Sequence, residues 1–200
     1  IANHSCAHAL VIGADKLSSL VNWSDRNTAV LFGDGAGAVI LGSRDGCPGI
    51  LSSYMGSNGA LAEILQVPGG GCALPITAEN VDDNHRTLQM NGRETFRHAV
   101  TAMVRSSEIA LDQCGLTPRD LACVIPHQAN LRIIEAISSR LHVPMEKFFI
   151  NLGRFGNTSA AAVGIALDEA ARTGRLQRGD KFLLVTFGGG LTYAASVIEW

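Results

Sequence analysis

The chain has 200 residues, of which 46% are hydrophobic and 17% are charged, and its formal net charge is −2 at pH 7. This composition supports the core of one large domain, or of one domain and part of another, and excludes an intrinsically disordered chain. The small net charge argues against a general nucleic-acid or membrane-surface binder, and no apolar run is long enough to span a bilayer. No secretory leader pattern opens the chain, so we expect a cytoplasmic protein without nucleic-acid or membrane partners.

The first part of the chain is expected to consist mainly of β-strands. Apolar runs bounded by turn residues predict four of them, at residues 8–13, 28–32, 36–42 and 49–55. The glycine-rich stretch 33–37 is expected to be a tight turn between the second and third strands. Residues 57–86 contain prolines, a glycine run and Asn/Asp clusters, which predict a long exposed excursion.

The second part of the chain is expected to alternate helices with strands. Apolar residues spaced three or four apart predict helices at 94–114, 129–141 and 158–172. Shorter apolar runs predict strands at 121–126, 148–151, 181–187 and 191–198. The last two strands, joined through three glycines, can pair as an antiparallel hairpin. We therefore expect a layered α/β fold with a mixed sheet.

Three loops at predicted strand ends carry polar groups that are capable of catalysis. Their sequences are PHQAN at 126–130, GNTS at 156–159 and FGGG at 187–190. Loops at strand ends are where α/β proteins usually assemble their sites. His127 follows an apolar strand and precedes a helix, whose N-terminus disfavours the imidazolium, so a neutral ring with a lowered pKa is expected. Taken alone, His127 could equally be a buried structural histidine.

The other polar positions also have structural explanations. Asn157 directly precedes a predicted helix, where Asn is a common N-cap. The glycines at 188–190 could form a bulge or turn, although they also expose N–H groups that could bind an oxyanion. The glycines at 33–37 are spaced G-x-G-x-G and precede a strand, which excludes the dinucleotide-binding pattern.

The five cysteines form no CxxC pair, and no second pair of Cys or His stands at ligand spacing. Reduced thiols and no metal site are therefore expected. Cys6 lies in the link before a strand rather than at a helix N-terminus, so nothing there favours a nucleophilic thiolate.

Taken together, the motifs resemble the β-ketoacyl-ACP synthase III family. The segments IPHQANLR (125–132), GNTSAA (156–161) and FGGGLT (187–192) have that family's order and spacing, and FGDGAG (32–37) and WSDR (23–26) match upstream. The resemblance runs from Ile1 to Trp200. Elongating condensing enzymes carry His where GNTSAA has Asn, and chalcone-type synthases surround their His/Asn pair with different sequence.

The resemblance implies a thiolase-like fold, layered αβαβα with a mixed five-stranded sheet, built from two similar halves and usually homodimeric. Residues 1–56 would form the end of the N-terminal half, and residues 57–200 would form the C-terminal half. By the same resemblance, the nucleophilic cysteine of the family would lie shortly before Ile1.

The activity implied by the resemblance is that of an acyltransferase. It loads a starter such as acetyl from CoA onto cysteine and condenses it with malonyl-ACP to 3-oxoacyl-ACP, which initiates type II fatty acid synthesis. His127 and Asn157 would hydrogen-bond the malonyl thioester carbonyl and stabilise the enolate formed by decarboxylation. Phe187 would crowd the carboxylate, and the Gly189 N–H would belong to the oxyanion hole. No permanently bound cofactor is implied, because the CoA thioester is a substrate.

The resemblance also implies residues that bind CoA and acyl carrier protein. Arg26 would contact the CoA nucleotide, and the pantetheine channel would be lined by Arg93, Phe96, Ala129 and Asn130. On one helix beside the channel mouth, Arg132 and Arg140 would attract the acidic carrier protein. A pair of solvated helix charges explains these two arginines equally well.

Two alternatives remain open. The chain could be a non-catalytic CoA- or ACP-binding fragment or subunit that pairs with a separate N-terminal half. It could also belong to a ketosynthase III of secondary metabolism that uses another starter.

Overall fold

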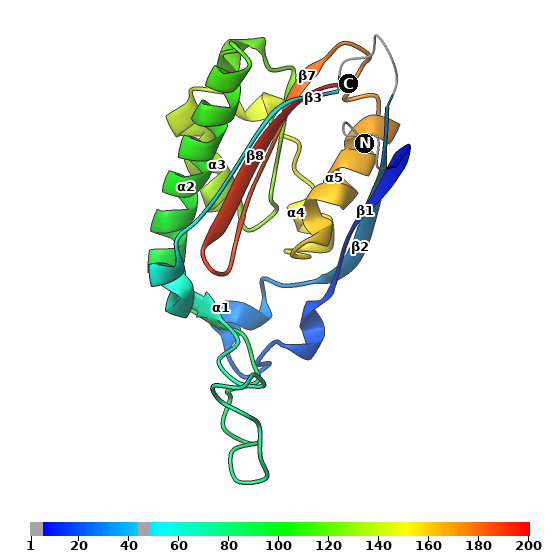
Figure 1. Ribbon diagram of the computed structural model, residues 1–200. Helices are drawn as coiled ribbons and strands as arrows, with labels where there is room; N and C mark the ends of the chain where they lie inside the picture. The colour runs from blue at the N-terminus through cyan, green and yellow to red at the C-terminus, as the bar shows by residue number, and fades with distance from the viewer. Residues whose placement is uncertain (1–5, 44–48) are drawn as a thin grey trace.

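The computed structural model describes residues 6–43 and 49–200, which form a stack of sheet and helix layers (Figure 1). The described strands are β1 (His8–Lys16), β2 (Asp34–Gly42), β3 (Ile50–Ser57), β4 (Leu65–Gln66), β5 (Gln89–Met90), β6 (Cys123–Pro126), β7 (Lys181–Gly188) and β8 (Thr192–Glu199). The larger sheet has the order β3-β8-β7-β6, with β6 parallel to β7 and the other neighbours antiparallel. Two smaller antiparallel pairs, β1-β2 and β4-β5, complete the strands.

Helices cover both faces of the larger sheet. The described helices are α1 (Arg26–Ala29), α2 (Gly92–Gln113), α3 (Leu131–Leu141), α4 (Leu152–Phe155) and α5 (Ala161–Arg172), with 3-10 turns η1 (Leu17–Ser19), η2 (Gly59–Ile64), η3 (Pro118–Asp120) and η4 (Met145–Lys147). Figure 1 shows α2 and α3 on one face, α5 on the other, and the β1-β2 pair beyond α5. This arrangement confirms the predicted layered α/β class with its mixed sheet. The larger sheet has four strands within the described residues, whereas five were expected.

The core on the two faces of this sheet follows from the alternation of side chains along each strand. Val124 and Leu183 pack with residues of α2 and α3, whereas Cys123, Ile125 and Phe182 pack under α5. A strand that is covered on both faces has no polar side, so β6 is a continuous apolar run. The result is a firmly packed scaffold whose strand ends carry the polar loops.

The contact between α5 and the β1-β2 pair depends on small residues. A Cβ at Gly37 would lie 3.0 Å from the Cα of Gly164, and a Cβ at Gly13 would lie 2.2 Å from the carbonyl oxygen of Ala160. Only glycine therefore allows the strands to lie this close to the helix. The Asp15 carboxylate also accepts a hydrogen bond from the Ala160 N–H at 3.1 Å. These contacts fix the start of α5 and the loop that precedes it.

The strand predicted at 28–32 is wrong, because α1 occupies part of this segment. The Asp25 carboxylate caps the helix by accepting hydrogen bonds from the Asn27 N–H and the Thr28 hydroxyl, each at 3.0 Å. The glycines at 33–37 consequently lead into β2 and do not form a turn between two strands.

The strand predicted at 148–151 is also wrong. A single parallel bridge joins Phe148 to Val124, where the Phe149 N–H donates to the Val124 carbonyl at 2.8 Å. The Asn151 N–H donates to a side chain instead, to Gln128 Oε1 at 3.1 Å, so no further strand pairing is made. The helix predicted from residue 158 begins at Ala161, after a turn that contains the GNTS motif.

The excursion predicted at residues 57–86 projects away from the layers (Figure 1). The β4-β5 pair closes its base through the Leu65–Met90 pairing. Just before it, β3 pairs along β8 of the larger sheet. The division of the chain into 1–56 and 57–200 stays a prediction, and this pairing favours a boundary before Ile50.

The described residues contain neither a membrane-spanning helix nor a metal-binding cluster. Across 6–43 and 49–200, none of the helices has the length and hydrophobicity that crossing a membrane requires. In these ranges no group of three His, Cys, Asp or Glu residues could hold a metal ion. Cys6, Cys72, Cys114 and Cys123 are free thiols, and Cys47 lies outside the described residues.

Candidate active site

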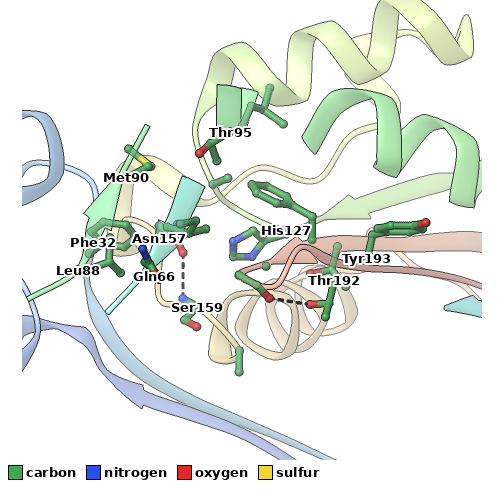
Figure 2. A pocket seen from close by; sticks show the side chains of 18 of the residues that line it. Phe32, Gln66, Leu88, Met90, Thr95, His127, Asn157, Ser159, Thr192 and Tyr193 are labelled. Atoms are coloured by element: carbon green, nitrogen blue, oxygen red, sulfur yellow. Dashed lines mark hydrogen bonds between the residues drawn. The ribbon is translucent and has the colours of Figure 1, made fainter. Parts of the chain in front are cut away.

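Two loops at strand ends of the larger sheet and the turn between α4 and α5 meet at a cavity of about 790 Å³ (Figure 2). The four positions predicted to be catalytic, His127, Asn157, Phe187 and Gly189, all line it. They come from the loop after β6, the turn before α5 and the end of β7 with its hairpin turn. The structure therefore brings together positions that lie up to 62 residues apart in the sequence.

His127 is buried directly after β6. Its backbone N–H donates to the Val185 carbonyl at 2.7 Å. Its ring meets the Phe187 ring edge-on, with centroids 5.7 Å apart. Burial lowers the pKa of the His127 imidazole to about 4, so the ring is neutral at pH 7. The neutral ring was predicted, but its cause is desolvation. The helix N-terminus that was expected to act lies further on, at Leu131, where the Asn130 side chain caps α3.

This lowered pKa predicts a specific dependence of stability on pH. The folded-state pKa of about 4 lies below the ordinary value of 6.5, so the unfolded chain takes up the proton first as the pH falls. The free energy of unfolding should therefore decrease as the pH falls from 6.5 to 4, with His127 contributing a loss on the order of 3 kcal/mol. Above pH 6.5 the titration of His127 should not change the free energy of unfolding.

Urea unfolding of the wild type and of His127→Gln between pH 4 and pH 7.5 measures this contribution. The stability of the wild type relative to the variant should be constant above pH 6.5 and decline below it. A difference that stays constant down to pH 4 would show that the folded and unfolded states protonate His127 equally.

Asn157 is held by its own backbone and by its own side chain. Its N–H donates to the Leu31 carbonyl at 2.8 Å, and its carbonyl accepts from the Gly33 N–H at 2.9 Å. Its Oδ1 accepts the Ser159 N–H at 2.9 Å, a local Asx turn that Figure 2 marks with a dashed line. Because Oδ1 is engaged in this way, the amide NH₂ is the end that can donate to a ligand. The helix N-cap is Ala160, so Asn157 does not have the predicted capping role.

Phe187 and Gly189 stand where β7 turns into β8. Phe187 is buried and pairs with Tyr193 across the hairpin. Gly189 is exposed in the turn, and a Cβ there would lie 3.0 Å from the Leu65 carbonyl oxygen at the base of the excursion. The lack of a side chain therefore lets the turn approach the excursion beside the cavity.

The residues predicted to bind CoA and carrier protein fall into two groups. Ala129 and Asn130 line the cavity, next to His127. The remaining five are exposed and lie outside the cavity wall: Arg26 at the start of α1, Arg93 and Phe96 in the first turns of α2, and Arg132 and Arg140 on α3. The structure thus separates this second group from the candidate catalytic positions.

Part of the cavity wall was not predicted. It includes Phe32, Met90, Thr95 and Tyr193, which come from four separate elements or loops. Phe32 forms a parallel bridge with Asn157, although the two are far apart in the sequence. The FGDGAG motif contains Phe32 and was noted, but a motif does not indicate which loop it will meet in space.

Comparisons with known proteins agree with this geometry. The family model of 3-oxoacyl-[acyl-carrier-protein (ACP)] synthase III matches residues 1–59, and the model of its C-terminal part matches residues 111–200. The β-ketoacyl-[acyl-carrier-protein] synthase III of Caldanaerobacter subterraneus subsp. tengcongensis is 51% identical over 193 residues. The chain belongs to the β-ketoacyl-ACP synthase III family. The matching segments include the three loops that carry His127, Asn157, Phe187 and Gly189, whereas the part of the cavity wall from Leu65 to Thr95 lies outside them.

Two further comparisons extend this result. The β-ketoacyl-ACP synthase III of a Roseiflexus species is 50% identical over all 200 residues. The crystal structure of 3-oxoacyl-[acyl-carrier-protein] synthase III from Aquifex aeolicus superimposes with a TM-score of 0.87 at 42% identity, over 97% of this chain and 58% of that one. This likeness confirms the predicted thiolase-like fold. The matches to the two curated relatives span 96% to 100% of this chain but only 58% to 61% of the length of each relative.

Proposed function

We propose that this chain carries the malonyl-activating site of a β-ketoacyl-ACP synthase III, which condenses a starter acyl group from CoA with malonyl-ACP. The observation that carries the proposal is that a buried neutral His127 and an oriented Asn157 amide line one cavity with Phe187. Family membership supplies the reaction class, and the cavity supplies groups suited to it.

The chemistry requires hydrogen-bond donors for an oxygen that becomes negative. When the malonyl thioester loses carbon dioxide, the electron pair of the broken C–C bond moves toward the thioester carbonyl and forms an enolate. A neutral imidazole N–H and the Asn157 amide NH₂ can both donate to that oxygen, and their fixed positions avoid reorganisation during the step. The enolate carbon then attacks the acyl carbon of the cysteine thioester, the C–C bond forms, and the thiolate leaves.

The surroundings of His127 favour this role over proton transfer. A histidine with a pKa of about 4 is a poor base at pH 7 and does not carry a charge that would hold the malonyl carboxylate in place. The buried Phe187 ring beside it offers the carboxylate no hydrogen bond. Both features favour the loss of a charged carboxylate as neutral carbon dioxide.

The nucleophilic cysteine, the partners and the assembly belong to the same proposal. We assign the cysteine to the part of the complete enzyme that corresponds to the relatives' remaining length. The acyl-CoA would bind along Arg26, Arg93 and Phe96, and the acyl carrier protein would dock at Arg132 and Arg140. The complete enzyme would be a cytoplasmic homodimer. These assignments rest on the family resemblance.

The test uses the enzyme expressed from its complete reading frame. Intact mass before and after incubation with acetyl-CoA should show the addition of one acetyl group, and release of carbon dioxide from malonyl-ACP should depend on the enzyme. A protein that gains no acyl group from a panel of acyl-CoAs and releases no carbon dioxide would support the non-catalytic binding subunit instead. The acyl-CoA that is transferred fastest identifies the starter.

A further inference from the structure

The residue after His127 occupies an unusual position in the structure. Gln128 is fully buried, with 1% of its surface exposed. Its Nε2 donates to the carbonyls of Pro126 at 2.9 Å and Phe149 at 3.2 Å. Its Oε1 accepts the N–H groups of Asn151 at 3.1 Å and Leu152 at 3.2 Å. Every hydrogen-bonding group of this amide is therefore used, and all of its partners are backbone atoms.

These four bonds join two loops of the candidate site. Pro126 belongs to the strand end that carries His127, and Leu152 is the first residue of α4. A helix leaves its first N–H groups without partners inside the helix, and here the Gln128 oxygen satisfies them. The short helix α4 is thus attached at its N-terminus to the backbone beside His127.

The other end of α4 leads directly to Asn157. The helix ends at Phe155, and Gly156 follows with φ of +68°, a conformation that favours glycine. Its N–H closes the turn by donating to the Leu152 carbonyl at 2.8 Å. The Asn157 backbone thus lies between two anchors, α4 on one side and its own bonds to Leu31 and Gly33 on the other. A shift of Leu152 would act on it through one helical turn.

A second set of contacts supports the same turn from the side of α5. The Asn151 Nδ2 donates to Glu169 Oε2 at 2.9 Å, and Glu169 Oε1 pairs with Arg154 Nη1 at 2.7 Å. Glu169 thus holds both the residue before α4 and a residue within it. Its neighbour Asp168 pairs with Arg172 on the same helix, at 2.8 Å, and among the described residues it makes no hydrogen bond or ion pair with α4.

We propose that Gln128 is a positioning residue that sets the location of Asn157 relative to His127, with Glu169 as its support. The inference rests on the proposed function, because it assigns these residues to the geometry of the malonyl-activating site. His127 is held independently of Gln128, by the bond of its backbone N–H to the Val185 carbonyl and by the contact of its ring with Phe187. Loss of Gln128 should therefore act mainly through Asn157.

The first test replaces Gln128 with Met, which keeps the length of the side chain and removes its polar atoms. A displacement of about 1 Å at a reacting group can cost about 100-fold in rate, so kcat for malonyl-ACP decarboxylation should fall about 100-fold with KM within about threefold. Transfer of the starter onto cysteine should stay within about twofold, because it does not use Asn157.

The matched control is Ser138→Ala in α3. It also removes a buried side-chain bond to a backbone carbonyl, that of Ser138 Oγ to Val143 at 2.7 Å, but it lies outside the α4 connection. Both half-reactions should remain within about twofold in this variant. In an Asn157→Ala background, Gln128→Met should lower kcat for decarboxylation little further, because the side chain that Gln128 positions is already absent.

Gln128→Met removes the side-chain partner of four buried or partly buried backbone groups, and the variant could fail to fold. The second test is therefore Glu169→Ala against Asp168→Ala, two neighbouring carboxylates that each pair with an arginine. Glu169→Ala should lower kcat for decarboxylation about tenfold, and Asp168→Ala should leave it within about twofold.

The outcomes separate this inference from the function on which it rests. A wild type that releases no carbon dioxide from malonyl-ACP would overturn the proposed function and this inference together. A wild type that is active and sensitive to His127→Ala, with folded Gln128→Met decarboxylating within about threefold of it, would overturn the inference alone. Equal losses in both half-reactions, additive effects with Asn157→Ala, or equal effects at Glu169 and Asp168 would also overturn it.

Discussion

The replacement His127→Ala is expected to lower the rate of malonyl-ACP decarboxylation about 10³-fold and to leave transfer of the starter from CoA to cysteine within about twofold. The buried neutral ring offers a donor whose position is fixed before the reaction, and water that fills the space left by the ring would have to reorganise as charge develops. Acyl transfer to cysteine does not create this enolate, so it should be spared. Asn157→Ala should show the same separation, with a loss of 10² to 10³-fold as an order-of-magnitude expectation.

The two half-reactions are measured separately in the complete enzyme. Release of carbon dioxide from malonyl-ACP reports the first, and the gain of mass from acyl-CoA reports the second. His98→Ala, a partly exposed histidine beside Glu94 on α2, is the control and should change neither. If both site variants decarboxylate at the wild-type rate, the roles assigned to His127 and Asn157 are wrong.

The second large effect is expected at Gly13, where a methyl group should destabilise the fold by at least about 3 kcal/mol. The added Cβ would lie 2.2 Å from the Ala160 carbonyl oxygen, and the obstructing atom is backbone, so no rotation of a side chain can relieve the overlap. The β1-β2 pair and α5 would have to separate, which would also disturb the Asp15 bond to Ala160.

The free energy of unfolding in urea measures this effect. Gly92→Ala is the matched control, because its Cβ would meet only Met90 Cε, at 3.9 Å, and it opens helix α2. That substitution should be neutral or stabilising by up to about 1 kcal/mol. A Gly13→Ala variant as stable as the control would mean that β1 and α5 are not packed at this distance.

The sequence alone determined the long helices, the C-terminal hairpin and the kind of fold, although two of the predicted strands were wrong. Apolar spacing located α2, α3 and the β7-β8 hairpin. The helices bury one apolar stripe against the larger sheet and the strands are buried within it, and the apolar pattern reflects this burial. The polar loop after β6 identified His127, since side chains at the ends of neighbouring strands meet at one edge of a sheet. Asn157 was identified by its motif, but it lies in the turn between α4 and α5 and not at a strand end, where it was predicted. The family motifs gave those positions roles that no single residue could indicate.

The tertiary structure decided features that depend on contacts between distant segments. The pKa of His127 is lowered by the protein packed around it and not by the start of α3, so its cause is absent from the local sequence. The glycines at 33–37 have the composition of a turn, yet they lie along or next to β2, where α4, the turn after it and α5 approach closely and the α5 backbone lies against Gly37. Gln128 lies in the PHQAN motif, but the motif does not indicate its role, because all its partners are backbone atoms whose positions depend on how the chain folds. A sequence pattern records which residues are buried, whereas which loops touch, and at what distance, follows only from the packing of the layers.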